Sequence, residues 1–399
     1  MRGPELITEP FTVSLIILKK ILVIFGTRPE AIKMAPVVLR LQEAAGLRVK
    51  VAVTAQHRQM LDQVLDIFAI RPDFDLDIMS PDQDLFDITS RALLGLKEVL
   101  RQEQPDLVLV HGDTTTTFVA ALAAFYLKIP VGHVEAGLRT RDKHRPFPEE
   151  INRHLAGVLT DYHFAPTPWA RDNLIAEGVA PDRIWVTGNT VIDALQIIAA
   201  RVGQEGKRWE DYFAREHGLS LAGKRLILVT GHRRENFGSG FHNICWALRD
   251  VAESFADVLV VYPVHLNPNV QRPVKEILGP VGNAGSGGRL ALLPPLEYAP
   301  FVYLLSQSYL VLTDSGGIQE EAPALGKPVL VMREVTERPE GVWAKTVKLV
   351  GTDRHKIFQE IKELLENRDS YQTMAQARNP YGDGQAASRI VQAIEEMFA

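Results

Sequence analysis

The chain has 399 residues, more than one hydrophobic core usually supports, so we expect two domains of ordinary size. Its 44 lysines and arginines against 49 aspartates and glutamates give a net charge of −5, which argues against nucleic acid or an anionic membrane as the main partner. The single cysteine, Cys245, excludes an internal disulfide framework and a cysteine-based zinc cluster.

The N-terminal segment contains an apolar run at residues 11–25, but Lys19 and Lys20 interrupt it well short of a membrane span. Glu5 and Glu9 occupy the place where a secretory signal would carry positive charge. We therefore expect residues 1–18 to form an extension, residues 21–25 to form the first core strand, and the protein to be cytoplasmic.

Strand-like and helix-like segments alternate along the rest of the chain. The first half predicts strands at 21–25, 49–54, 107–111, 131–135, 162–165 and 184–187, with helices between them such as 31–44, 58–68, 88–101 and 116–127. Residues 191–217 are helical and charged without a strand signal. The second half then predicts strands at 226–230, 258–263, 290–293, 310–313, 329–332 and 347–350.

This alternation is typical of parallel sheets that carry helices on both faces. We predict an α/β fold of two Rossmann-like, doubly wound domains, residues 19–190 and 221–380, joined by a helical link at 191–220. A last helix within residues 381–399 could pack back onto the first domain. Ligands of such sheets bind at the carboxyl ends of the strands, so the two domains should face each other across a cleft that holds the site.

Charged side chains follow several of the first-half strands. The motif FGTRPEAIK places Arg28 and Lys33 at the start of a helix, where the alternative is a pair of solvated cations. Asp113 in HGDTTTT follows a buried strand, although a helix cap would explain it equally well. Glu135 in GHVEAGLRT ends an interior strand, where an unpaired carboxylate is costly. Glu149 in RPFPEEINR leads into a helix, and capping is the alternative there too.

The second half offers a binding site for phosphate. In TDSGGIQEEAP a strand stops at Ser315, Gly316 and Gly317 and a helix begins, so unpaired backbone N–H groups and the helix dipole favour an anion. Glu321 lies about one turn into that helix, within reach of a ribose, and an ordinary βα turn is the alternative.

Two further positions complete this half. His232 in TGHRRENFG sits at a strand end between arginines, where a structural histidine is the alternative, and Arg338 lies in REVTERPEG. Three carboxylates opposite a phosphate site suit the making or breaking of a bond to a nucleoside diphosphate. No G-x-G-x-x-G follows a strand and no convincing metal-ligand cluster occurs, so we expect neither a nicotinamide cofactor nor a metal.

The motifs FGTRPEAIKMAP, TAQHRQMLDQVL, HGDTTTT, HVEAGLRT, TGHRREN, TDSGGIQEEAP and VMREVTERPEG resemble the bacterial non-hydrolysing UDP-N-acetylglucosamine 2-epimerases, in family order from about Ile21 onward. The resemblance implies the glycosyltransferase-B arrangement of two domains, usually a homodimer, without a cofactor. It further implies active-site positions at Arg28, Lys33, Asp113, Glu135, Glu149 and His232.

The same resemblance implies the nucleotide contacts. Ser315, Gly316 and Gly317 match the diphosphate site, Glu321 and Arg338 the remaining contacts, and Phe301 the residue near the uracil. Leu296 departs from the glutamine of some relatives, which puts that uracil contact in doubt. Gln56 and Gln59 fit the place where a second substrate molecule activates bacterial members, and activation stays open.

The reaction implied is elimination of UDP to a 2-acetamidoglucal, followed by re-addition with inversion at C2. Asp113 and Glu149 are our candidates for the two proton-transfer groups, Glu135 for support of the ring and His232 for the leaving phosphate. The alternatives are a glycosyltransferase of the same architecture, a hydrolysing epimerase, an epimerase of a modified UDP-2-acetamido sugar and a non-catalytic sugar-nucleotide sensor.

Overall fold

In a computed structural model of the chain, the described residues are 18–55, 58–80, 82–279 and 288–398. Gln56, residues 1–17 of the expected extension and residues 282–287 of the glycine-rich loop lie outside them.

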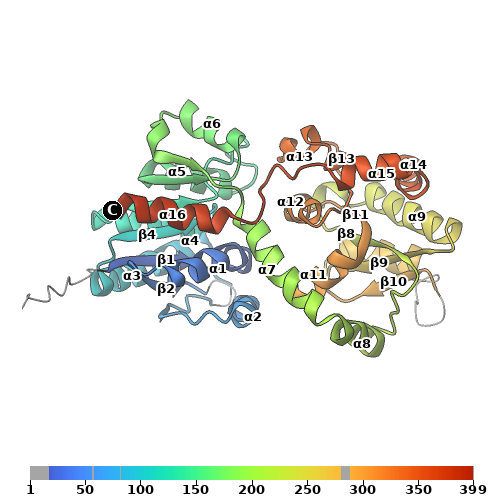
Figure 1. The fold of residues 1–399 in the computed structure, drawn as a ribbon, viewed down its shortest axis with the longest axis horizontal. Coiled ribbons are helices and arrows are strands. Elements are labelled where there is room, and N and C mark those ends of the chain that lie inside the picture. Colours follow the sequence, from blue (N-terminus) through green and yellow to red (C-terminus); the bar gives the residue numbers. More distant parts are fainter. Residues whose placement is uncertain (1–17, 56–57, 81, 280–287, 399) are drawn as a thin grey trace, which may run out of the picture.

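Two separate parallel sheets organise the described residues (Figure 1). The first sheet contains β1 Lys19–Phe25, β2 Leu47–Val53, β3 Phe74–Asp75, β4 Leu107–His111, β5 Val131–Val134, β6 Tyr162–Ala165 and β7 Ile184–Val186. The second contains β8 Arg225–Thr230, β9 Val258–Pro263, β10 Leu290–Leu293, β11 Ser308–Thr313, β12 Val329–Val331 and β13 Val347–Leu349. The predicted α/β class with two Rossmann-like sheets is confirmed. The sequence missed β3, because two residues are too short for a periodic pattern.

Helices connect the strands and cover both sheets. Those of the first half are α1 Arg28–Glu43, α2 Arg58–Phe68, α3 Leu85–Glu103, α4 Thr115–Tyr126, α5 Glu149–Leu159, α6 Pro168–Ala176 and η1 Pro181–Arg183. The rest are α7 Thr190–Gln204, α8 Gly206–His217, η2 Arg234–Asn236, α9 Ser239–Ser254, α10 Pro268–Pro273, the π-helical turn η3 Val274–Leu278, α11 Tyr298–Gln307, α12 Gly316–Ala324, α13 Pro339–Trp343, α14 Arg354–Glu366, α15 Arg368–Ala375 and α16 Ala386–Phe398.

The strand order fixes where each sheet can hold a ligand. The first sheet runs β3-β2-β1-β4-β5-β6-β7 and the second β10-β9-β8-β11-β12-β13. In each sheet the connections therefore change direction between two adjacent strands, β1 and β4 in the first and β8 and β11 in the second. Ligands of open parallel sheets bind outside the carboxyl ends of the strands at such a point. Arg28, Asp113, His232 and Ser315 all follow these four strands.

Helix α7 joins the two halves through a continuous core. Its buried residues Ala194, Leu195, Ile198 and Val202 belong to one apolar cluster with residues of both sheets. The helix packs against α1 and α16 on one side and α11 and α12 on the other. The expected single link is in fact two helices, since α7 ends at Gln204 and α8 begins at Gly206.

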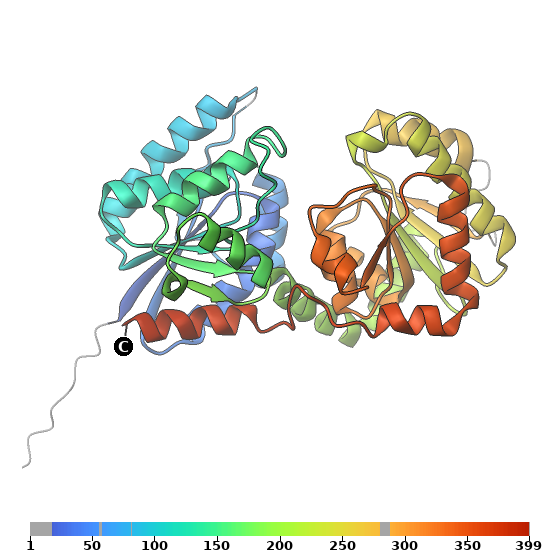
Figure 2. The ribbon, with the colours of Figure 1, turned by 90° about the horizontal axis from the view of Figure 1, so that it is seen from above.

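The C-terminal helix lies with the first half, although the chain before it belongs to the second. Helix α16 packs against α1 and α7, and Figure 2 shows it beneath the first sheet, far from β13. Its buried stripe, which includes Ile390, Val391 and Ile394, joins the same apolar cluster. The chain therefore crosses between the halves twice. Within the part of the chain that the structure describes, no helix is long and apolar enough to cross a membrane.

Candidate active site

A buried glutamate builds the turn after β1. Glu30 is 2% exposed and accepts hydrogen bonds from the backbone N–H groups of Gly26, at 3.0 Å, and Thr27, at 2.8 Å. It also accepts from the Thr114 hydroxyl after β4, at 2.7 Å. Glu30 thereby ties the start of α1 to the start of α4, and its role is structural. The same turn leads into α1, so Arg28 and Lys33 lie beside the place where the connections of the first sheet change direction.

Glu135 is the most enclosed of the predicted carboxylates. It follows β5 in the left-handed backbone region, with φ of 62°, a conformation that is unfavourable for most residues and often marks functional sites. Its side chain, 8% exposed, forms an ion pair with Lys33 and lies 3.7 Å from Nε2 of His111. Burial acts to raise the pKa of Glu135, but the charge of Lys33, together with the neighbouring His111 side chain, outweighs it and holds that pKa well below its usual range. Glu135 is therefore an ionised group, better suited to offset positive charge than to hold a proton.

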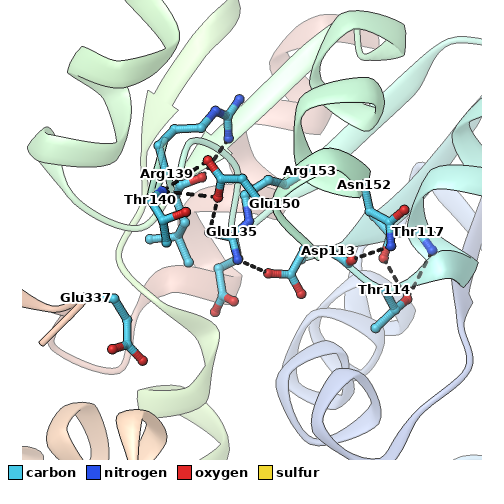
Figure 3. Close-up of polar contacts among 12 residues, drawn as sticks. Asp113, Thr114, Thr117, Glu135, Arg139, Thr140, Glu150, Asn152, Arg153 and Glu337 are labelled. Carbon is cyan, nitrogen blue, oxygen red and sulfur yellow. Dashed lines mark hydrogen bonds and ion pairs between the residues drawn. The ribbon is translucent and has the colours of Figure 1, made fainter. Parts of the chain in front are cut away.

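Asp113 is held from α5. The Arg153 guanidinium forms an ion pair with its carboxylate, and Nδ2 of Asn152 donates to its backbone carbonyl at 3.0 Å (Figure 3). The cap of α4 is Thr114, whose hydroxyl accepts from the Thr117 N–H at 3.1 Å, so the capping alternative for Asp113 is wrong. A β-carbon on Gly112 would lie 3.9 Å from Oε1 of Glu135, so Asp113 and Glu135 end neighbouring strands side by side.

The two glutamates at the start of α5 differ in their partners. Glu150, 1% exposed, accepts from the backbone N–H of Thr140 at 3.1 Å (Figure 3). It also accepts from the backbone N–H of Arg141 at 2.8 Å. It therefore shapes the loop between β5 and α5. Glu149 has a buried Oε2 without a hydrogen-bond partner among the described residues. An unsatisfied buried carboxylate oxygen is costly and calls for a function, which distinguishes Glu149 from its neighbour.

In the second half, Asp314 organises the turn that carries His232. Asp314 is fully buried after β11 and accepts from the backbone N–H groups of His232 and Arg233, at 2.9 and 2.8 Å, and from Asn236 Nδ2 at 3.2 Å. The imidazole of His232 stacks on His265 with ring centroids 5.4 Å apart. Burial, followed by Arg233 and His265, lowers the pKa of His232 against the opposing charge of Asp314. The ring is thus half exposed and shifted toward its neutral form near pH 7.

The N-terminus of α12 lies where the sequence predicts an anion site. Ser315 is its N-cap without a side-chain capping bond, so the hydroxyl is not used by the helix. A β-carbon on Gly316 would overlap the Arg338 guanidinium, whereas one on Gly317 would meet Oε1 of Glu321 at an ordinary 3.4 Å. Only glycine lets Arg338 lie against the first turn of this helix.

Two buried glutamates on α12 have opposite characters. Glu320 forms an ion pair with Arg338, whose pKa is raised because Glu320 and Glu337 outweigh the effect of burial. Glu321 lacks such a partner, and its Oε2 has no hydrogen bond among the described residues. Burial and the adjacent charge of Glu320 raise the pKa of Glu321 to about 8. Glu321 is therefore largely protonated near neutral pH and could donate a hydrogen bond as well as accept one.

The remaining predicted residues are less informative. Phe301 lies on α11, half-buried with Leu296 against the main core. Gln56 and the side chain of Gln59 lie outside the described residues, although Gln59 itself belongs to α2. Within the described ranges, no group of three or more His, Cys, Asp or Glu side chains could hold a metal ion.

Sequence reasoning missed Arg153, Asp314 and Glu320. Arg153 lies in a quoted motif, but its pairing with Asp113 spans 40 residues. Asp314 could have been suspected, because a carboxylate wedged between a buried strand and a glycine pair needs several donors. Glu320 differs from Glu321 by one position on the helix, and no local pattern separates them.

Comparison with known proteins agrees with this geometry. The family model described as UDP-N-acetylglucosamine 2-epimerase matches residues 39–395. The UDP-N-acetylglucosamine 2-epimerase of Escherichia coli K12 is 57% identical over 376 residues, 94% of this chain and 98% of the relative. The solved structure of the Neisseria meningitidis UDP-GlcNAc 2-epimerase bound to UDP-GlcNAc is 50% identical with a TM-score of 0.84 and covers 94% of this chain and 100% of that one.

A more distant solved structure, the UDP-GlcNAc 2-epimerase of Methanocaldococcus jannaschii in complex with UDP-GlcNAc and UDP, is 31% identical with a TM-score of 0.75, covering 94% of this chain and 99% of that one. The matches span both sheets and the segment between them. The resemblance inferred from the motifs is confirmed, and the chain belongs to the UDP-N-acetylglucosamine 2-epimerase family.

Proposed function

We propose that this protein is an isomerase that interconverts UDP-N-acetylglucosamine and UDP-N-acetylmannosamine. The observation that carries the proposal is the placement of two unlike groups beside each other. The carboxylates Asp113, Glu135 and Glu149, which follow β4, follow β5 and begin α5, belong to the first half. The N-terminus of α12 and Arg338 belong to the second. Asn189 contacts both Glu135 and Glu320, so the two groups are one side chain apart. Family membership supports the same substrate.

The chemistry requires both groups because C2 of this sugar is not next to a carbonyl. A carboxylate takes the C2 proton while the C1–O bond breaks and its electron pair leaves with the β-phosphate of UDP. The resulting 2-acetamidoglucal then regains a proton on the opposite face of C2, and the phosphate oxygen attacks C1 to restore the bond. The leaving diphosphate carries the largest developing charge, and the α12 N–H groups and Arg338 would stabilise it.

We assign the proton transfers to Asp113 and Glu149. Glu149 has a buried oxygen with no partner among the described residues, as expected of a base that awaits its substrate. Asp113 accepts from Arg153, which fixes its orientation. Glu135 is ionised beside Lys33 and would offset positive charge at C1, and His232 would assist the departing phosphate.

For the nucleotide contacts we keep the expectations drawn from the sequence. We propose that Ser315, Gly316 and Gly317 bind the diphosphate, that Glu321 binds the ribose, and that Arg28 and Phe301 complete the site. Activation by a second substrate molecule at Gln56 and Gln59 stays a prediction, as does the cytoplasmic location.

Incubation of the protein with UDP-N-acetylglucosamine in heavy water tests the reaction. Elimination and re-addition must place deuterium at C2 of the intact epimerised UDP-sugar, detected by mass spectrometry and NMR. A hydrolysing enzyme would release free sugar, and a glycosyltransferase or a sensor would leave the C2 hydrogen in place. Epimerised product without deuterium would contradict the elimination mechanism. Parallel incubations with modified UDP-2-acetamido sugars would show whether one of them reacts faster.

We also propose that the protein works as a homodimer through the first half. The consecutive helices α3, α4 and α5 pack on one another and leave large apolar side chains exposed, namely Leu94, Phe125, Tyr126, Ile151, Leu155 and Val158. Exposed apolar groups in such number are typical of a protein interface, and a second copy supplies a matching surface. We expect the wild type to sediment at twice the chain mass of 44.4 kDa. The Phe125→Glu/Val158→Glu variant should sediment as a monomer. Leu266→Glu, equally exposed in the second half, should leave the dimer intact.

A further inference from the structure

Asn189 connects carboxylates of the two halves. It is 3% exposed and lies directly before α7. Its Nδ2 donates to Oε2 of Glu135 at 2.8 Å and to Oε2 of Glu320 at 2.9 Å. Both amide hydrogens are therefore used, one on each half of the molecule.

The orientation of this amide is set by the backbone. Oδ1 of Asn189 accepts from the Val191 N–H at 3.1 Å as the N-cap of α7, so a flipped amide would lose the cap and turn its oxygen toward two carboxylates. The Asn189 N–H donates to the Tyr381 carbonyl at 2.7 Å, on the segment where the chain returns to the first half. The residue is thus anchored at the point where both crossings of the chain meet.

Each of the two carboxylates has a cation on its other side. Glu135 pairs with Lys33, and Glu320 pairs with Arg338. The resulting chain of side chains is Lys33–Glu135–Asn189–Glu320–Arg338, in which two positive and two negative charges cancel. A neutral double donor is the one group that bridges two buried carboxylates without adding charge or leaving an acceptor between them.

We propose that Asn189 is a positioning residue for the reaction, an inference that rests on the proposed function. It fixes the separation of Glu135 and Glu320, and through them the places of Lys33 and Arg338 on either side of the substrate. When the diphosphate of the substrate attracts the two cations, Asn189 remains as the donor that keeps both carboxylates ionised and in place. It acts through these neighbours and does not touch the reacting atoms.

The variants Asn189→Asp and Asn189→Ala separate this role from simple support of the fold. Aspartate keeps the shape but puts a third carboxylate between two others, and only its protonated form can donate a hydrogen. The charged and titratable groups that surround it are Arg28 and Lys33 from α1, His111 at the end of β4, Glu135 after β5, Glu320 and Glu321 from α12, Arg338 before α13, and Tyr381. Asn173→Asp is the matched control, because Asn173 is also buried but contacts the Gly137 carbonyl and Arg141.

Turnover of all variants is measured from pH 6 to pH 8.5, with UDP affinity by calorimetry. We expect kcat of Asn189→Asp to fall about tenfold or more at pH 8 and to recover toward pH 6, the scale for a buried acceptor that loses its donor. Asn189→Ala should be slow at every pH, and UDP affinity should change less than kcat in both. Wild-type kcat in either variant, an equal loss for Asn189→Asp at every pH, or the same recovery in Asn173→Asp would overturn the inference.

Failure of the proposed function would be recognised separately, because wild type would then not epimerise UDP-N-acetylglucosamine at any pH. In that case thermal melting decides the inference on its own. Relative to wild type, Asn189→Asp should melt lower at pH 8 than at pH 6, because the added carboxylate must then ionise between Glu135 and Glu320. A pH-independent difference in melting temperature would overturn the bridging arrangement.

Discussion

In both sheets the connections change direction between two adjacent strands, but the residues that follow those strands differ. In the first sheet, Asp113 and Glu135 follow β4 and β5 and are held by Arg153 and Lys33 from helices. In the second, Asp314 accepts hydrogen bonds from backbone and amide donors, and α12 begins after Ser315, whose side chain makes no capping bond. The first half therefore presents side-chain acids, whereas the second presents the N-terminus of a helix, which we propose as the anion site.

Under the proposed function, the first half carries the proton transfers and the second half binds the nucleotide. A backbone anion site binds a diphosphate regardless of what the sugar does, while carboxylates held by arginine and lysine can exchange protons or offset charge. One fold can carry both because the loops at the strand ends, and not the strands, supply the chemistry. Changes in the first half should therefore affect turnover, and changes in the second should affect nucleotide binding or local stability.

The largest effect is expected from the acids of the first half. Asp113→Asn and Glu149→Gln keep size but remove basicity, so kcat should fall by orders of magnitude while UDP still binds. NMR of stopped reactions measures kcat, and calorimetric titration with UDP measures the binding affinity. Asp106→Asn, at the opposite end of β4 where the carboxylate pairs with Lys19, is the matched control and should keep its turnover. Near-native turnover of Asp113→Asn would show that Asp113 does not transfer the proton and only pairs with Arg153.

A smaller effect, on binding, is expected from the second half. Gly316→Ala would push against the Arg338 guanidinium, which Glu320 and Glu337 hold in place, so UDP affinity should weaken by about tenfold or more. Glycine is therefore needed at position 316 for the Arg338 side chain as well as for the approach of phosphate. Gly203→Ala, on α7 with open space around the added carbon, is the control. Unchanged affinity in Gly316→Ala would place the diphosphate away from this turn.

Asp314→Asn should act on stability. The amide would turn a donor toward the His232 and Arg233 N–H groups, and we expect a loss of about 1–3 kcal/mol in the free energy of unfolding, typical of a buried donor left unsatisfied. Urea titration measures it. The exposed Asp257→Asn, which loses only a surface pair with Arg225, should change the same free energy by less than about 1 kcal/mol. Equal losses would mean that Asp314 contributes no more than a surface pair.

The smallest effect concerns pH. The pKa of Glu321 is raised to about 8 from its ordinary value of 4.5, so the folded protein holds more protons than the unfolded chain between these values. Its stabilising contribution is therefore complete below pH 4.5 and is lost as pH rises through about 8. Glu321→Gln resembles the protonated form, and its melting temperature should fall less than that of wild type between pH 6 and pH 9. Identical slopes would show that Glu321 is ionised throughout.

Much of the fold could be predicted from the sequence because its signals are local. Runs such as Ile21–Phe25 are buried on both faces, and glycine, proline and small polar residues mark where each strand ends. The carboxyl ends of adjacent parallel strands meet at one edge, so strand-end motifs also predicted which acids and cations would gather. The sequence did not predict β3, two residues long, the break between α7 and α8, or short helical turns such as η1 and η2.

The sequence by itself determined the class of fold, the family and several of the charged residues that lie at the strand ends. The tertiary structure alone decided what each one does: Glu30, Glu150 and Asp314 became structural, Glu149 and Glu321 kept free oxygens, and Asn189 came to lie between Glu135 and Glu320. The physical reason is that the state of a buried carboxylate depends on the donors around it. Those donors come from segments as far as 131 residues apart, whose contact is set by packing and leaves no local pattern.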